Sequence, residues 1–149
     1  MQHIRRADMR DIYRIAEIIV FNYRLNFYPI FRYDPYYFDE LSVLSLAETY
    51  RDPSVLRDTF VYDDGVVKGV VQLCGTEIKR LFIEPVLQGQ GIGALLLSYA
   101  VTHRGADHLW ALEKNTRAIA FYQRNGFSLT DERRLEEDTD EYLILLRRQ

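Results

Sequence analysis

Three glycines at alternate positions mark the stretch whose residue types most clearly suggest chemistry, the glycine loop Gln88-Gly89-Gln90-Gly91-Ile92-Gly93-Ala94. An apolar, β-branched run leads into it and another apolar run, 95–101, leads out, so a strand gives way to a helix here. Glycine lacks the Cβ atom that would hold a ligand away from the backbone. The first turn of a helix has unpaired amide groups and about half a positive charge. The glycine loop therefore predicts an anion site, above all for phosphate.

Two common phosphate-binding loops do not fit this stretch. The pattern Gly89-x-Gly91-x-x-Ala94 satisfies a relaxed dinucleotide fingerprint, and Glu113 follows 19 residues after Ala94. However, five residues separate Ile83 from Gly89, too many for the direct strand-to-helix turn of that fold, and only 36 residues follow Glu113. A P-loop needs Gly-Lys-Ser/Thr, and the loop has no lysine.

The segments before the loop predict a first strand at 4–7 and two helices. Asp8 is a suitable N-cap for a helix with an apolar face, and Asp34-Pro35 is a second start signal. The second helix is expected to end before Pro53, with four side chains turned inward: Phe38, Leu41, Leu44 and Ala47.

Residues 21–38 contain nine of the twenty aromatic residues of the chain. About half are expected to pack the two helices against a sheet. A buried tyrosine needs a partner for its hydroxyl, so a tyrosine-rich segment favours an edge or a cleft. The others, including Phe27 and Tyr28, are therefore candidates for the wall of a substrate pocket.

The remaining segments predict a strand meander at 59–62, 66–74 and 77–83, with a tight turn at Asp64-Gly65. Cys74 is expected to be a small core residue. The helix after the glycine loop should end near His103 with Gly105 as its cap. A short strand at 109–112 and a helix at 117–125 should follow, the latter capped by Asn115 or Thr116.

Two closing strands, 127–134 and 141–146, are joined by the acidic turn 136–140, which is interpreted as solvated and without function. The order β-α-α-β-β-β-α-β-α-β-β predicts one α/β domain over residues 1–149. Its sheet should be mixed but mostly antiparallel, with six to seven strands and about four flanking helices.

Composition excludes several classes of function. The chain is 48% hydrophobic, which argues against disorder, and its net charge of −3 gives no basic footprint for nucleic acid. No apolar run approaches the ~20 residues needed to span a bilayer, and the N-terminus lacks a secretion signal. One cysteine and three scattered histidines indicate no metal site. We therefore expect a cytoplasmic protein without nucleic-acid, membrane or metal partners.

Two motifs resemble the GNAT superfamily of N-acetyltransferases. Gln88-x-x-Gly91-x-Gly93 after a strand is similar to the family's acyl-CoA signature. The segment 115–127, with Tyr122 and Gly126-Phe127, is similar to its second conserved element, about 20 residues further along. Both motifs have the family's order and lie on the expected elements, and the resemblance covers residues 76–127 closely.

The resemblance implies acetyl-CoA as cosubstrate, with its pyrophosphate held by the amides of residues 88–94. The pantetheine arm would pair with the main chain of three strand residues, Leu81, Phe82 and Ile83. It would pass through a V between that strand and the one ending at Leu112. Asn115 matches a position that contacts the cofactor, and it is equally suited to be a helix cap.

The resemblance also implies that Tyr122 protonates the thiolate that leaves during acetyl transfer. Glu77 matches a catalytic glutamate of some members and is a candidate base or substrate contact; the alternative is a water chain to solvent. The acceptor would be a primary amine of a small molecule or peptide, entering beside residues 22–38. Because that segment is aromatic with few charges, we expect an apolar or aromatic amine rather than a polycation.

Two other functions remain open: a non-catalytic acyl-CoA sensor or partner-binding module, and an acyltransferase for a non-amine acceptor. The uninterrupted glycine loop and Tyr122 favour the enzyme. A homodimer is also left open.

Overall fold

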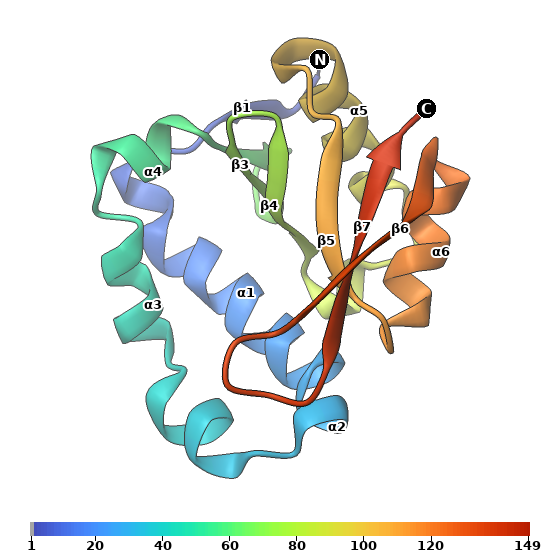
Figure 1. Cartoon of the computed structure of the whole chain (residues 1–149). Coiled ribbons are helices and arrows are strands. Elements are labelled where there is room, and N and C mark those ends of the chain that lie inside the picture. The colour runs from blue at the N-terminus through green and yellow to red at the C-terminus, as the bar shows by residue number, and fades with distance from the viewer. Residues whose placement is uncertain (1) are drawn as a thin grey trace.

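The computed structural model describes residues 2–149 as a seven-stranded sheet flanked by six helices (Figure 1). The strand order is β1-β2-β3-β4-β5-β7-β6, and every neighbouring pair is antiparallel except β4 and β5. The strands are β1 (Ile4–Arg6), β2 (Thr59–Asp63), β3 (Val67–Cys74), β4 (Glu77–Ile83), β5 (His108–Leu112), β6 (Phe127–Leu135) and β7 (Tyr142–Arg148). The predicted fold class is confirmed.

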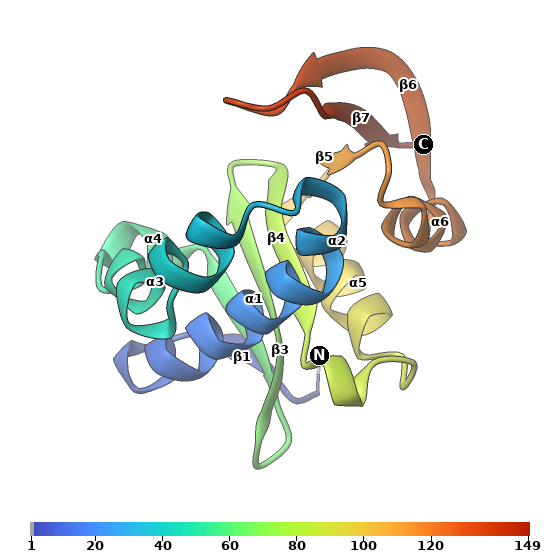
Figure 2. The same cartoon turned by 90° about the horizontal axis from the view of Figure 1, so that it is seen from below.

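Helices cover both faces of the sheet (Figure 2). Helices α1, α3 and α4 pack on β2 and β3 around one apolar cluster, and α5 and α6 pack on the opposite face around a second. The helices are α1 (Ile12–Asn26), α2 (Tyr28–Phe31), α3 (Val43–Thr49), α4 (Pro53–Arg57), α5 (Ile92–Arg104) and α6 (Thr116–Arg124). Short 3-10 turns at Met9–Asp11 and Pro85–Leu87 precede α1 and follow β4.

The expected single helix after Asp34-Pro35 is wrong. A π-helical turn spans Pro35–Glu40, the backbone then becomes extended at Leu41, and α3 begins with a new cap at Ser42. The Ser42 hydroxyl accepts a hydrogen bond from the Ser45 amide, whereas Asp34 makes no cap and accepts a hydrogen bond from the Tyr28 hydroxyl. Asp34-Pro35 therefore marks the start of the π-helical turn at Pro35–Glu40 and not the start of a long helix.

The break also changes which side chains face inward. Leu41 and Ala47 are buried as expected, but Phe38 is 53% exposed and Leu44 is 72% exposed. Cys74 is a further correction, because its side chain is exposed. It lies at the end of β3 beside buried Leu73, and successive strand residues point to opposite faces of a sheet.

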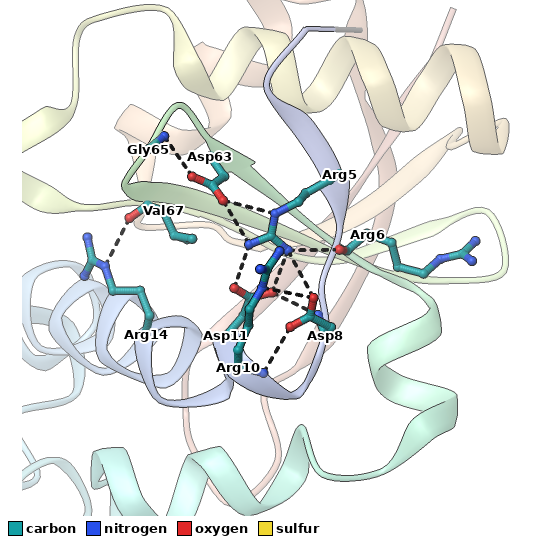
Figure 3. A network of polar contacts seen from close by, with 9 residues as sticks. All are labelled: Arg5, Arg6, Asp8, Arg10, Asp11, Arg14, Asp63, Gly65 and Val67. Atoms are coloured by element: carbon teal, nitrogen blue, oxygen red, sulfur yellow. Dashed lines mark hydrogen bonds and ion pairs between the residues drawn. The ribbon is translucent and has the colours of Figure 1, made fainter.

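An ionic network fixes the start of the chain to the sheet (Figure 3). The Arg5 guanidinium donates to both carboxylate oxygens of buried Asp11 at 2.8 Å, and its Nε donates to Asp63 at 3.1 Å. Burial acts to raise the pKa of Asp11, but the hydrogen bonds from Arg5 and the Asp8 amide leave it below its ordinary value. The network joins β1, the entry to α1 and the β2–β3 hairpin.

The sheet opens between its two parallel strands. Strands β4 and β5 pair only at Glu77 with His108 and at Ile78 with Leu109. The register of β4 against β3 also shifts after Ile78, which places an extra residue, Lys79, in a bulge. Beyond this point β4 and β5 separate, so the V that the resemblance implied is present. Among residues 2–149, no helix has the length and apolar character required to cross a membrane.

Candidate active site

A cleft of about 1170 Å3 lies where β4 and β5 separate. One wall is the aromatic side of α1, α2 and the π-helical turn, and the other comes from β5 and α6. The turn between β6 and β7 extends over the same opening (Figure 1). Strand β4 contributes residues 78–82 to the floor. The cleft thus lies between the two half-sheets.

Tyr122 projects from α6 into this cleft and is only 8% exposed. Its ring packs on Phe121 and Phe127 at centroid distances of 5.1 and 6.0 Å. The hydroxyl has no hydrogen-bond partner among the residues that the structure describes. Burial raises the pKa of Tyr122 above the ordinary value of a phenol, so the hydroxyl stays protonated. It can therefore donate a proton or a hydrogen bond to a group in the cleft.

The glycine loop leads into α5 without a side-chain cap. Gly91 is the N-cap residue, its φ of +84° is one that glycine adopts without strain, and no side chain accepts a hydrogen bond from the first turn. The amides of Ile92, Gly93 and Ala94 therefore lack intrahelical acceptors and are available to an anion. The absence of a side chain at Gly93 also allows α5 to pack closely on α6, because a Cβ there would lie 3.3 Å from the Phe121 ring.

The Gln88 side chain fixes the loop to its surroundings. Its Nε2 donates to Asn22 Oδ1 at 3.1 Å and to the Ile83 carbonyl at 3.3 Å. Asn22, which is buried on α1, donates to the same carbonyl at 2.8 Å. These bonds position the end of β4. Sequence reasoning missed Asn22, for which the only signal was an amide on an otherwise apolar helix.

The main chain of β4 alternates between β3 and the opening. The Glu84 amide donates to the Lys68 carbonyl, so by the alternation of an antiparallel pair Phe82 also bonds to β3. Leu81 and Ile83 then direct their backbone groups toward the opening. The Ile83 carbonyl already accepts a hydrogen bond from Asn22. The Ile83 amide and the amide and carbonyl of Leu81 therefore remain available to a ligand in the opening.

Two of the other candidate residues line the cleft. Asn115 does so while its side chain accepts the Ala118 amide at 3.3 Å, and it thus caps α6. Phe27 also lines the cleft, with its ring 4.8 Å from that of Tyr23.

Tyr28 and Glu77 lie elsewhere. Tyr28 is not part of the cleft wall and instead donates a 2.6 Å hydrogen bond to Asp34. Glu77 lies at the closed end of the V, opposite His108, with its carboxylate 3.7 Å from Lys79 Nζ. It is not among the residues that line the cleft.

Charged residues that sequence reasoning had not assigned also line the cleft. The acidic turn, expected to be merely solvated, contributes Glu136, Glu137, Asp138 and Asp140 to its rim. This corrects the expectation of aromatic walls with few charges. Arg80 of β4 lines the floor. The turn is distant in sequence from α1, α2 and β4, so the sequence pattern alone did not place it beside them.

The comparisons with known proteins agree with this geometry. Residues 56–129 match the family model described as an acetyltransferase (GNAT) domain. The matched stretch contains both the glycine loop and Tyr122. The chain belongs to the GNAT superfamily.

A curated relative and a solved structure are similar to this chain. The peptidyl-lysine N-acetyltransferase YjaB of Salmonella typhimurium is 33% identical over 85 residues, which cover 57% of this chain and 59% of that protein. The chain thus matches little more than half of that relative's length. The solution structure of apo YjaB from Escherichia coli has a TM-score of 0.70 at 23% identity and covers 97% of this chain and 95% of that one.

A second similar structure was solved with a ligand. The PaiA N-acetyltransferase of Thermoplasma acidophilum, in complex with coenzyme A, has a TM-score of 0.64 at 19% identity. The match covers 95% of this chain and 96% of that one. At these identities the two structures establish the fold.

Proposed function

We propose that this GNAT protein transfers the acetyl group of acetyl-CoA directly to a primary amine of a small molecule or peptide. One observation carries the proposal. The cleft where β4 and β5 separate is lined by Tyr122, and the loop that follows β4 leads into the uncapped start of α5. The coenzyme A complex of PaiA and the peptidyl-lysine acetyltransferase activity named for YjaB support it.

The glycine loop would hold the pyrophosphate of acetyl-CoA. Amides of residues 92–94 supply donors at the positive end of α5. Leu81 and Ile83 would pair with the amides of the pantetheine arm, as another strand would, and Asn115 lies on the opposite side of the opening. The thioester would then lie beside the bulge in β4, within the cleft that Tyr122 lines.

In the reaction, the amine nitrogen would attack the thioester carbonyl, and the carbon–sulfur bond would break as the amide bond forms. Tyr122 would give its proton to the departing thiolate. The proton lost by the attacking nitrogen would return Tyr122 to its neutral form. No external reductant or oxidant is required.

The acceptor must first lose a proton. An ammonium group with a pKa of ~10.4 is only about one part in 2,500 neutral at pH 7, which corresponds to roughly 4.6 kcal/mol. We favour loss of this proton through water at the cleft mouth, beside the acidic turn. Glu77 is the alternative base, and a Glu77→Gln variant that loses the pH dependence of kcat would support it.

A two-step measurement tests the proposed function. Thermal shift with acetyl-CoA, coenzyme A and NAD separates an acyl-CoA protein from a dinucleotide protein, and we expect stabilisation by the first two alone. Thiol release from acetyl-CoA with a panel of primary amines then tests turnover. Stabilisation without turnover on any amine would favour a non-catalytic sensor. Turnover with thiols or alcohols but no amine would favour the non-amine acyltransferase.

A further inference from the structure

Arg80 is a cation in the floor of the cleft that has only neutral partners among the described residues. Its Nε donates to the Tyr23 hydroxyl at 3.1 Å. Its Nη1 donates to the Tyr50 hydroxyl and to Gln72 Oε1, each at 3.1 Å. Arg5, Arg14 and Arg104 are also partly buried, but each of them pairs with a carboxylate.

The guanidinium remains charged in this setting. An arginine guanidinium stays protonated in proteins, and the pKa of Arg80 lies above its ordinary value although burial acts to lower it. A buried charge without a counter-ion is unfavourable, and buried charges in proteins are usually paired. A ligand that brought an anion into the cleft would supply the missing partner.

The remaining donors of Arg80 point to where that anion would lie. Nη2 has no partner among residues 2–149, and within the same range no side-chain nitrogen is both fully buried and unpaired. Nη2 is therefore reached from the cleft that Arg80 lines. Three bonds fix the planar group, so a carboxylate can meet it in a charge-assisted pair without first ordering the side chain.

We infer that Arg80 binds a carboxylate of the acceptor, so that the amine acetylated by this protein is an amino acid or a similar amino carboxylate. The inference rests on the proposed function, because it assigns the acceptor of that same site. The acidic turn across the cleft has the opposite charge and would favour the ammonium end of such a molecule. An internal residue of a peptide has neutral amides on both sides and would leave Arg80 unpaired.

Matched sets of acceptors test this inference. Each set contains a free amino acid, its carboxamide and its decarboxylated amine, for example phenylalanine, phenylalaninamide and phenethylamine, or lysine, lysinamide and cadaverine. Converting the carboxylate to an amide lowers the pKa of the neighbouring α-amine, so kcat/KM is expressed per neutral amine for each acceptor. On that basis, with the wild-type protein, we expect the value for the free amino acid to exceed that for the carboxamide by about tenfold or more. Equal values, or a preference for the carboxamide, would overturn the inference without any variant.

Variants then assign the preference to Arg80. In Arg80→Gln the ratio of free acid to carboxamide should fall to about one. In Arg80→Lys it should be intermediate, because the charge remains but the planar group that three hydrogen bonds hold in place is lost. Thermal shift with acetyl-CoA shows that each variant is folded. A ratio that Arg80→Gln leaves unchanged overturns the role of Arg80. Absence of turnover with every acceptor overturns the proposed function instead.

Discussion

Tyr122 combines a largely buried ring with a hydroxyl that has no partner among the described residues, and this combination supports the proposed role of Tyr122 as an acid. A buried hydroxyl that serves packing normally has a hydrogen-bond partner. Tyr50 illustrates the structural case, since its hydroxyl donates to Gln72 and accepts from Arg80. The hydroxyl of Tyr122 is instead available to a molecule in the cleft.

We predict that Tyr122→Phe separates catalysis from stability. The ring contacts with Phe121 and Phe127 remain and no protein hydrogen bond is lost, so the free energy of unfolding should change little. Turnover should fall by about 10²- to 10⁴-fold, as for loss of a general acid, with acetyl-CoA binding retained. Thiol-release kinetics and thermal shift measure the two effects. A variant with full activity would falsify the acid role.

Asp11 permits a prediction of acid stability. Its pKa is lower in the folded chain than in the unfolded chain, so its stabilising effect is fully present above a pH of about 4 and is lost as the pH falls through the folded value. Asp11→Asn should therefore lower the free energy of unfolding by about 2 kcal/mol at pH 7 and by less at pH 3. Urea titrations at the two pH values measure this.

Asp8→Asn is the matched control for Asp11→Asn. Asp8 belongs to the same network, but its side chain is 51% exposed, and asparagine can still cap the Arg10 amide. Its stability at pH 7 should change by less than about 0.5 kcal/mol. An equal loss in both variants would contradict a specific role for the buried carboxylate.

At the scale of elements, the glycine loop and the strand before it were predictable because their signals are local. The β4 bounds, the start of α5 and its cap at Gly105 follow from a β-branched run, from glycines and from an apolar helical face. Residues 28–57 were not predictable in the same way. There Leu41 is buried with Val20 and Tyr37, and this tertiary contact accompanies a break in the helix that Asp34-Pro35 suggested.

Gly91→Ala should weaken cofactor binding through the backbone. An alanine at a φ of +84° is strained by about 1–2 kcal/mol, and relaxation would turn the first amides of α5 away from the anion. Gly65→Ala is the control, because Gly65 also has a positive φ, +114°, but lies in the β2–β3 turn away from the cleft. Both variants should lose stability. Only Gly91→Ala should reduce the thermal shift produced by coenzyme A.

At the scale of the molecule, the cleft joins segments that are far apart in the chain, including the aromatic segment after α1, the β4 floor, Tyr122 of α6 and the turn at 136–141. Such a set becomes visible only when the sheet order is known. The acidic turn is the clearest case: its composition was evident from the sequence, but its position over the opening depends on the pairing of β6 with β7.

The charge of this turn predicts a dependence on salt. Glu137→Gln combined with Asp140→Asn should raise KM for an amine acceptor by about two- to tenfold at low ionic strength, because two attractive charges are removed from the rim. The difference should shrink in about 0.5 M salt, where exposed charges are strongly screened.

Asp131→Asn combined with Glu132→Gln removes the same charge from β6 outside the cleft wall and serves as the control. Its KM should remain close to that of the wild type. If the two double variants behaved alike, net charge rather than the position of the turn would explain the effect.

The short pairing between β4 and β5 also affects how the chain resists self-association. An unpaired strand edge normally attracts strands of other molecules. The outer edges of this sheet are poor templates, because β1 has three residues and β6 has a register shift between Leu129 and Arg133 and is rich in charge. The free edge of β4 at Leu81 lies inside the cleft, whose walls include residues of α1 and α6. A single extended chain is narrow enough to reach this edge, whereas a strand that already belongs to the sheet of another molecule is too wide.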